Sequence, residues 1–330
     1  MFACQLRRQA SRMSISTSRR GLVKLAAAAL TGVAAVGVAG AAPAASALAG
    51  ERRGISRIRI RTAAGAFDAV AAGPVHGRPV LLLHGFPEFG IEWEHQLRGL
   101  AAAGYRAVAP DQRGYSPGVR PVGVDKYRLD HPVTDVRAMA DALGWRRFDL
   151  VGHDWGAAVG WIVAARYAHR VRSFTAVSVP HLGAFAEALR EDPVQQEASK
   201  YMDTFRQPSP IPEDKILASG PPALPGVPAQ KCAEYFRRLS EPGALTAALN
   251  WYRANDFQGY SEPVRVPTLF VASTRDPFVA PSGVQATRRW VTGPYRLVNL
   301  DGVGHNIPEQ AAKTMTTLLL THLTGGGSSR

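Results

Sequence analysis

The sequence is poor in cysteine, and this limits its chemistry. Only Cys4 and Cys232 occur among 330 residues. Because Cys4 lies in a segment that we expect to be removed, the remaining thiol can build neither a disulfide framework nor a thiolate metal site. The nine histidines lack metal-ligand spacing, such as two on one helical face with a glutamate. We therefore predict no metal.

Acidic residues are absent from the first 50 positions. Six basic residues there contribute to a formal charge of +13 for the whole chain, and the remainder carries 33 basic and 26 acidic residues, or +7. Those charges are interspersed along the chain, which is typical of a solvated basic surface. We expect no nucleic-acid partner and no stable membrane association of the processed protein.

Residues 1–49 have the features of a secretory signal. A basic start that contains Arg19 and Arg20 precedes an Ala/Gly-rich stretch, and small residues offer cut sites after Ala47 or Ala49. The alternative, an uncleaved anchor helix, is a poor span because Ala and Gly are only weakly apolar. The arginine pair resembles a twin-arginine signal, which implies export of a folded protein to the periplasm or the medium.

The mature chain alternates strands and helices. The two opening strands are expected at 58–61 and 65–72, and buried parallel strands at 79–85, 106–111, 148–154, 173–179, 267–273 and 295–300. Helical periodicity occurs near 91–103, 132–143, 155–168 and 309–322. This order predicts an α/β protein with a doubly wound, mostly parallel sheet.

The alternation stops between residues 181 and 264. That stretch is polar and helical and is interrupted by proline-rich segments. We predict that it is a helical cap over the carboxyl edge of the sheet, where ligands bind in such folds. The core would then have two parts, residues 50–180 and 265–330.

The segment VGHDWGA, residues 151–157, predicts a nucleophile elbow between a strand and a helix, but with Asp154 in the usual serine position. Gly152 and Gly156 would allow the tight turn and close helix–strand packing. Without an elbow serine, a conventional esterase is disfavoured.

Ser116, in GYSPG, fits the literal serine elbow pattern. The residue after the nucleophile must donate its backbone N–H to the oxyanion, and Pro117 has none. We interpret Ser116 as a turn residue.

An acid and a histidine follow the elbow in the expected order. Asp276 comes just after the strand at 267–273, and His305 just after the strand at 295–300. Singly, these could be a turn residue and a loop histidine, and Asp154 a helix cap. Together, at the carboxyl ends of strands, they predict a catalytic triad.

The motifs HGFPE (84–88), PDQRGYS (110–116), VGHDWGA, STRDPFVAP (273–281) and GVGHN (302–306) resemble those of the α/β-hydrolase epoxide hydrolases and their dehalogenase relatives. The resemblance extends over residues 56–323. It implies the α/β-hydrolase fold, with a mostly parallel sheet and an inserted helical cap, and an enzyme that needs no cofactor.

An aspartate nucleophile suits attack on a saturated carbon, because it leaves an ester that water can cleave. The resemblance implies that His305, oriented by Asp276, activates that water. The backbone N–H groups of Phe86 and Trp155 would form the oxyanion hole. His84 is expected to fix the loop rather than to transfer protons.

The leaving group distinguishes an epoxide hydrolase from a dehalogenase. SKYMDTFRQPSPIPE and LNWYRAND resemble the two cap motifs that carry ring-opening tyrosines, which implies roles for Tyr201 and Tyr252. Either tyrosine could instead be a half-buried helix residue. Together they favour an epoxide substrate, which reacts with water to give a vicinal diol.

A haloalkane or haloacid dehalogenase is the alternative. Haloalkane dehalogenases usually carry Asn where this chain has Phe86, and fluoroacetate dehalogenases Arg where it has Trp155, although the Trp155 side chain could donate to halide. One departure concerns epoxide hydrolases: Asn306 follows the histidine where Trp is common. A second alternative is a non-catalytic binding protein of this fold, which would be expected to lack part of the triad. The sequence leaves the oligomeric state open.

Overall fold

The computed structural model describes residues 54–325. The predicted signal, residues 1–49, lies outside them. Within the described range, none of the helices combines the length and apolar character needed to cross a membrane.

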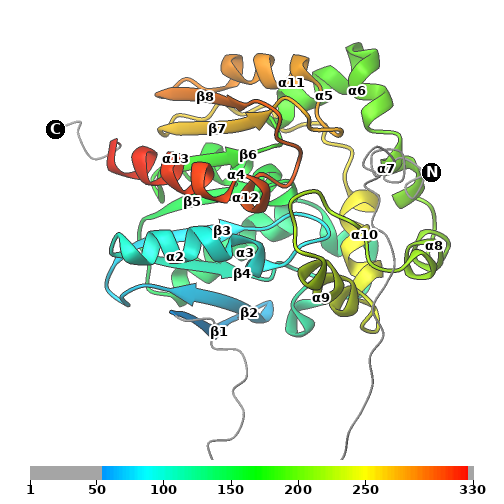
Figure 1. Ribbon diagram of the computed structural model, residues 1–330, viewed down its shortest axis with the longest axis horizontal. Coiled ribbons are helices and arrows are strands. Elements are labelled where there is room, and N and C mark those ends of the chain that lie inside the picture. Colours follow the sequence, from blue (N-terminus) through cyan, green and yellow to red (C-terminus); the bar gives the residue numbers. More distant parts are fainter. Residues whose placement is uncertain (1–53, 326–330) are drawn as a thin grey trace, which may run out of the picture. The chain divides into compact units, whose positions relative to one another are not determined.

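An eight-stranded sheet forms the centre of the fold (Figure 1). Its strands are β1 (Ile55–Thr62), β2 (Gly65–Ala72), β3 (Arg78–Leu83), β4 (Tyr105–Pro110), β5 (Phe148–His153), β6 (Val171–Val177), β7 (Thr268–Ser273) and β8 (Tyr295–Leu300). Their spatial order is β1-β2-β4-β3-β5-β6-β7-β8. Strand β2 pairs antiparallel with β1 and β4, and all other neighbours pair parallel. The predicted α/β class with a mostly parallel sheet is confirmed.

The central strands are buried on both faces, which explains their unbroken apolar runs. In β3, Val80 and Leu82 belong to one hydrophobic cluster, whereas Leu81 and Leu83 belong to another. Alternate side chains of a strand point to opposite faces, so a strand covered on both sides needs apolar residues at every position.

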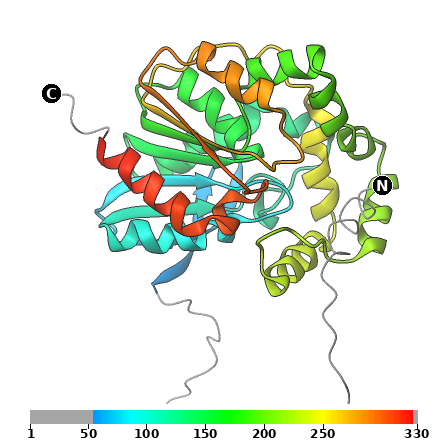
Figure 2. The ribbon, with the colours of Figure 1, turned by 45° about the horizontal axis from the view of Figure 1, so that its top comes forward.

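Helices cover the two faces of the sheet (Figures 1 and 2). Helix α2 packs against α13 over the first face, and α3 packs against α4 over the second. The core helices are α2 (Glu94–Ala102), α3 (Asp130–Ala142), α4 (Trp155–Arg166), α11 (Pro281–Ala286), α12 (Ile307–Gln310) and α13 (Ala312–Gly325). The 3₁₀ helices are η1 (Gly90–Trp93), η2 (Pro117–Val119), η3 (Val124–Tyr127) and η4 (Thr287–Trp290).

Six further helices lie between β6 and β7, within the predicted insertion. They are α5 (Leu182–Glu191), α6 (Pro193–Ala198), α7 (Tyr201–Phe205), α8 (Ile211–Ser219), α9 (Ala229–Leu239) and α10 (Ala244–Ala254). Helices α7 to α10 lie beyond one end of the strands, at the right of Figure 1.

Helix α10 is tied to the core by side chains that bond to main-chain groups. Asn255 accepts from the N–H of Leu129 at 3.0 Å and donates to the carbonyl of Tyr127 at 3.0 Å. The indole of Trp251 donates to the carbonyl of Arg113 at 3.0 Å. Because these groups are buried, the bonds hold α10 at a fixed position over the sheet edge.

Two predicted helices are each divided in the structure. The stretch at 91–103 consists of η1 followed by α2, and the stretch at 309–322 of α12 followed by α13. The second break occurs at Ala311, whose φ of −117° lies outside the helical range. Hydrophobic periodicity predicts which face of a helical stretch is buried, but it does not reveal that one residue within the stretch departs from the helix.

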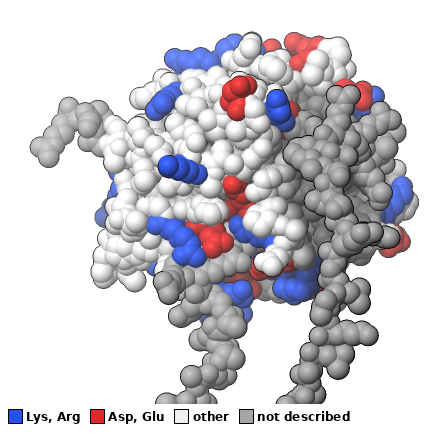
Figure 3. All heavy atoms as spheres, viewed as in Figure 1, with Lys and Arg blue, Asp and Glu red and all other residues white. Residues whose placement is uncertain are grey.

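Charged residues of both signs are interspersed on the face seen in Figure 3. Ion pairs of the described chain include Arg166 with Asp130 and Glu262, and Arg289 with Glu187. On this face the positive formal charge is therefore spread among acidic groups rather than gathered in one patch.

Candidate active site

Asp154 occupies the sharp turn between β5 and α4. Its φ of 50° and ψ of −118° are unusual for a residue with a side chain. A Cβ at Gly152 would lie 2.2 Å from the carbonyl oxygen of Gly156, and one at Gly156 would lie 2.2 Å from that of Leu83. Only glycine fits at both positions, so the turn presents the Asp154 carboxylate beyond the strand end.

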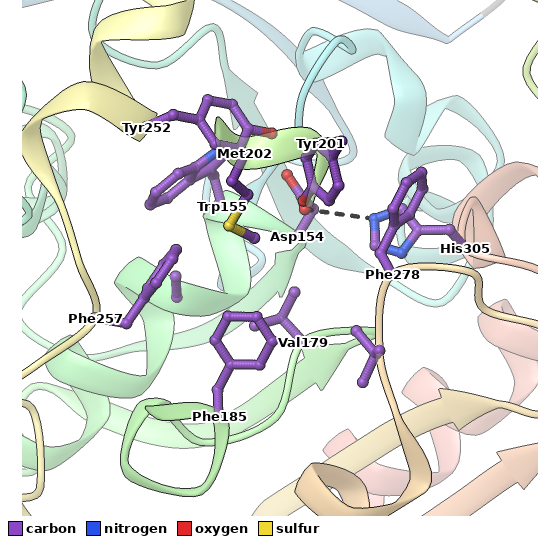
Figure 4. Close-up of a pocket in the computed structure, with 12 residues that line it drawn as sticks. Asp154, Trp155, Val179, Phe185, Tyr201, Met202, Tyr252, Phe257, Phe278 and His305 are labelled. Atoms are coloured by element: carbon purple, nitrogen blue, oxygen red, sulfur yellow. Dashed lines mark ion pairs between the residues drawn. The ribbon is translucent and has the colours of Figure 1, made fainter. Parts of the chain in front are cut away.

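The structure brings Asp154, Asp276 and His305 together from three separate segments (Figure 4). Nε2 of His305 lies 3.4 Å from Oδ2 of Asp154, and Nδ1 lies 2.7 Å from Oδ2 of Asp276. The two acids follow β5 and β7, and the histidine follows β8. Because these strands are parallel, their carboxyl ends meet at one edge of the sheet.

The charges of this triad stabilise one another. Burial would raise the pKa of Asp154, but the hydrogen bond and the charge of His305 outweigh it and hold the pKa below 3.8. Burial would lower the pKa of His305, but the charge of Asp276 and the bonds to both carboxylates raise it well above 6.5. The resting site is thus an ionised Asp154 facing an imidazolium.

The backbone N–H of Phe86 donates to Oδ1 of Asp154 at 3.0 Å. Trp155 is the first residue of α4, so its N–H has no acceptor within the helix. These are the two groups that the sequence predicts for the oxyanion hole. Phe86 thus engages Oδ1 of Asp154, whereas His305 faces Oδ2.

His84 holds the loop that carries Phe86. Its Nε2 accepts from the N–H of Gln112 at 2.9 Å, so its Nδ1 carries the hydrogen that bonds the carbonyl of Gly85 at 2.8 Å. Burial lowers the pKa of His84 to about 4, which keeps the ring neutral. Both nitrogens are therefore engaged with the main chain.

A cavity of about 360 Å³ lies over Asp154. Its polar groups come from Asp154, His305, Tyr201 and Tyr252. The walls are otherwise apolar, and half of these residues are aromatic; they include Trp155, Val179, Phe185, Met202, Phe257 and Phe278 (Figure 4).

Tyr201 and Tyr252 reach this cavity from the insertion. Tyr201 begins α7 and Tyr252 lies in α10, and these helices pack against each other with the two ring centroids 6.1 Å apart. Burial and the charge of Asp154 raise the pKa of both phenols well above 10. Both hydroxyls therefore remain protonated and can donate a hydrogen bond.

Ser116 has a structural place. Its hydroxyl donates to the carbonyl of Asp111 at 2.7 Å and accepts from the N–H of Asp68 at 2.9 Å. These bonds tie the turn after β4 to β2, and the residues that line the cavity do not include Ser116.

The sequence reasoning did not identify a buried acid cluster behind His305. We define it as Glu88, Glu92, Glu309, Lys231 and His153, all of which are buried. Lys231 pairs with Glu309, and Nδ1 of His153 lies 3.1 Å from Glu92. The sequence contains one indication of this cluster: the segment FPEFGIEW places two acids four residues apart in an apolar stretch.

Asn306 belongs to this region. Its amide donates to Oε1 of Glu88 at 2.7 Å. Asn306 stands where epoxide hydrolases commonly carry Trp, and its side chain turns toward the cluster and is absent from the cavity wall.

Three donors of the cluster could hold a metal ion. One ligand atom each from Glu88, Glu92 and His153 lie within 4.8 Å of one another. Histidine spacing in the sequence does not reveal this set, because it holds one histidine, His153, which is 61 positions from Glu92. An ion would have to displace the hydrogen bond that already joins His153 to Glu92.

The acids of the cluster outnumber its one lysine. Within residues 54–325, Oε2 of Glu88, Oε1 of Glu92 and Oε2 of Glu309 have no hydrogen-bond partner. Burial and the charge of Glu92 raise the pKa of Glu88 to about 8, and burial and the charge of Glu309 raise that of Glu92 well above 4.5. Protonation is thus the main way in which Glu88 and Glu92 avoid buried charge.

Comparison with known proteins gives consistent results. The α/β hydrolase fold family matches residues 78–312. Epoxide hydrolase A of Mycobacterium tuberculosis is 32% identical over 305 residues, which covers 78% of this chain and 93% of the relative. Epoxide hydrolase 4 of Homo sapiens is 32% identical over 285 residues, covering 81% of this chain and 78% of the relative.

Solved structures agree in fold. One from a study of α/β-hydrolase epoxide hydrolases in metagenomes from hot environments has a TM-score of 0.74 and 28% identity, and covers 81% of this chain and 98% of that chain. Epoxide hydrolase VrEH1 from Vigna radiata has a TM-score of 0.70 and 27% identity, and the match covers 84% of this chain and 100% of that chain.

The raised pKa of Glu88 predicts a specific pH dependence of stability. Below pH 4.5 the group is protonated in both the folded and the unfolded protein; as pH rises toward about 8, only the unfolded protein loses the proton, so the free energy of unfolding falls. Glu88→Gln keeps the carbonyl that binds Asn306 and cannot ionise. We expect its loss of stability between pH 5 and 8.5 to be smaller by a few kcal/mol, measured by urea denaturation.

The matched control is Glu94→Gln, at a half-buried glutamate of α2 that pairs with Arg98. The free energy of unfolding of Glu94→Gln should depend on pH as that of the wild-type protein does. If Glu88→Gln also showed the wild-type dependence, Glu88 would be ionised in the native protein and the prediction would be wrong.

Proposed function

The chain belongs to the α/β-hydrolase fold family, among its epoxide hydrolases, and we propose that it adds water to an epoxide to yield a vicinal diol through an ester on Asp154. The observation that carries this proposal is an ionised carboxylate on the elbow that faces two protonated phenols across a small cavity. A carboxylate can attack saturated carbon, and phenols can protonate the oxygen that leaves it.

Ring opening is the first half-reaction. Oδ2 of Asp154 attacks an epoxide carbon, and the carbon–oxygen bond to the ring oxygen breaks. The alkoxide that forms takes a proton from Tyr201 or Tyr252. Meanwhile Oδ1 stays on the N–H of Phe86, 3.0 Å away, as the carbonyl oxygen of the new ester.

Ester hydrolysis is the second half-reaction. Nε2 of His305 takes a proton from water, whose oxygen adds to the ester carbon. The negative charge on Oδ1 of Asp154 is stabilised by the N–H groups of Phe86 and Trp155. The bond from the ester carbon to the alkyl oxygen then breaks, and this oxygen takes the remaining proton of the added water. The diol is released, and the ionised carboxylate and the imidazolium are restored.

Ring opening prepares His305 to act as the base in ester hydrolysis. Asp154 and Asp276 together raise the pKa of the resting imidazole. Once Asp154 is an ester it carries no charge, so the pKa of His305 falls and the ring can lose its proton, which is available to restore the phenol. The neutral ring is the form that can act as a base.

The cavity limits the substrate. The residues that line it include aromatic rings but no lysine or arginine. This lining favours an uncharged epoxide with an aryl or alkyl group, and styrene oxide is a suitable probe.

Trapping the ester tests the proposal directly. His305→Ala removes the base for hydrolysis but keeps Asp154, so styrene oxide should leave a stable adduct with the full mass of the substrate. Intact-protein mass spectrometry and peptide mapping should locate it on Asp154, and Asp154→Ala should give none. His95→Ala, at an exposed histidine of α2, is the control and should turn over without an adduct.

Other outcomes separate the alternatives. If a bromoalkane alkylated Asp154 with loss of the halogen while epoxides did not react, the protein would be a dehalogenase. No adduct from either reagent would exclude covalent catalysis by this carboxylate.

The two phenols should act mainly on ring opening. Tyr201→Phe or Tyr252→Phe removes one donor to the ring oxygen, and the rate of alkylation should fall about 10²- to 10³-fold, with a larger loss in the double variant. Stopped-flow tryptophan fluorescence can follow alkylation, since Trp155 lines the cavity. Tyr260→Phe, at a tyrosine beside Arg166, is the control; unchanged alkylation in the double variant would refute these roles.

We also propose that residues 1–49 direct export to the periplasm or the medium by the twin-arginine route. The arginine pair and the Ala/Gly-rich stretch support this proposal. N-terminal sequencing of the exported protein should find a start at residue 48 or 50, and Arg19→Lys with Arg20→Lys should abolish export. A mature start before residue 40 would contradict the proposed cut.

A further inference from the structure

The acid cluster contains a bond path that leads to the main chain of the catalytic base. We propose that a protonated Glu92 donates a hydrogen bond to His153 and that the two are positioning residues, which hold the backbone of His305 in place. This inference rests on the proposed function, because it assigns His305 the role of base.

The carbonyl oxygen of His305 is the starting point. It accepts from the hydroxyl of Ser178 at 2.8 Å and lies 3.1 Å from Nε2 of His153. A carbonyl oxygen can only accept a hydrogen bond, so Nε2 of His153 must carry a hydrogen. If His153 is neutral, its Nδ1 is then a bare acceptor.

Glu92 faces that acceptor. Its Oε2 lies 3.1 Å from Nδ1 of His153, and both side chains are almost completely buried. A carboxylate and a bare nitrogen cannot bond to each other, so one proton must lie between them. Either Glu92 is a carboxylic acid that donates to a neutral ring, or a carboxylate faces an imidazolium.

The environment favours the neutral pair. Burial raises the pKa of Glu92 well above 4.5 and lowers the pKa of His153, so the proton stays on the oxygen. Among the charged groups that face Glu92, Glu309 and Asp154 raise its pKa, whereas Lys231 and His305 lower it. Glu309 and Lys231 pair with each other, which limits the effect of either one.

Glu88 and Asp154 act on His153 from the other sides. Both raise the pKa of its ring, but burial and the charge of His305 lower it, and the net direction is downward. Glu88 in turn bonds to Asn306, the neighbour of His305. The groups around the pair thus leave the neutral arrangement in place.

This arrangement connects three parts of the site. Glu92 lies in η1, a few residues after the loop of Phe86; His153 immediately precedes Asp154; and the carbonyl belongs to His305. Asp276 holds the His305 ring on one side, and His153 with Ser178 holds its main chain on the other. The path thereby sets the distance between base and nucleophile.

Loss of the Glu92 proton would break this path. The carboxylate would attract the hydrogen of His153 to Nδ1, and Nε2 would no longer donate to the His305 carbonyl. Turnover should therefore fall at alkaline pH. Glu92→Gln supplies an amide N–H that cannot ionise, so it should keep the bond and remove this alkaline loss.

Two variants of Glu92 test the proposal. Glu92→Leu removes the donor and should slow hydrolysis of the ester about 10- to 100-fold more than it slows alkylation, because the base is displaced. Glu92→Gln should stay near wild-type rates at neutral pH. Glu94→Leu, on the adjoining α2, is the matched control and should leave both steps unchanged, and thermal unfolding should verify that each variant is folded.

The ring of His153 gives a readout that needs no substrate. Nitrogen-15 NMR of the wild-type protein, with the signal assigned by its loss in His153→Gln, should show a hydrogen on Nε2 and a bare Nδ1 at pH 7. If this tautomer is found but no epoxide reacts, the proposed function fails while the proton arrangement stands.

Three results would overturn the inference. They are a hydrogen on Nδ1 of His153 at neutral pH, a Glu92→Gln variant as impaired as Glu92→Leu, and a stoichiometric divalent cation in the purified protein by elemental analysis. The cation would require an ionised Glu92 and Nδ1 of His153 as ligands, together with Glu88.

Discussion

The close contact between β3 and the start of α4 is the constraint on which the site depends. Gly156 lies so near the carbonyl of Leu83 that no side chain fits between them. This contact forces the main chain of Asp154 into a positive φ and directs its carboxylate away from the strand. The same turn begins α4 at Trp155, directly after Asp154, so the proposed nucleophile and one proposed oxyanion donor come from one feature.

Around that turn, environment rather than residue type decides which acids are charged. Asp154 stays ionised because His305 bonds to it, whereas Glu88 and Glu92 are driven toward the neutral form because they are buried with too few cations. An ionised carboxylate can attack carbon, and a neutral one can donate a hydrogen bond. In the proposed function, the same chemical group therefore supplies both the nucleophile and a support for the base.

Much of the fold, and the positions of the candidate site residues in it, could be predicted from local sequence patterns. Apolar runs bounded by turns predict the parallel strands, because a strand covered on both faces must be apolar throughout. Asp154, Asp276 and His305 each follow such a strand, and parallel order alone brings their carboxyl ends to one edge. Helix ends were less predictable, since one residue such as Ala311 can interrupt a helix without disturbing its periodicity.

The acid cluster could not be predicted in the same way. Glu92 and His153 are 61 positions apart, and whether a carboxyl group keeps its proton depends on burial and on neighbours from η1, α9 and α12. For the same reason Asn306, which follows the histidine directly, turns to Glu88 instead of the cavity.

The sequence by itself determined the order of strands and helices and the elbow, and it predicted the three residues proposed as a triad, because each of these features depends on a short segment. Only the tertiary structure decided how Tyr201 and Tyr252 meet Asp154, how large the cavity is and which buried acids are neutral. Those properties depend on distances and dielectric surroundings that arise when remote segments pack together, and no local pattern records them.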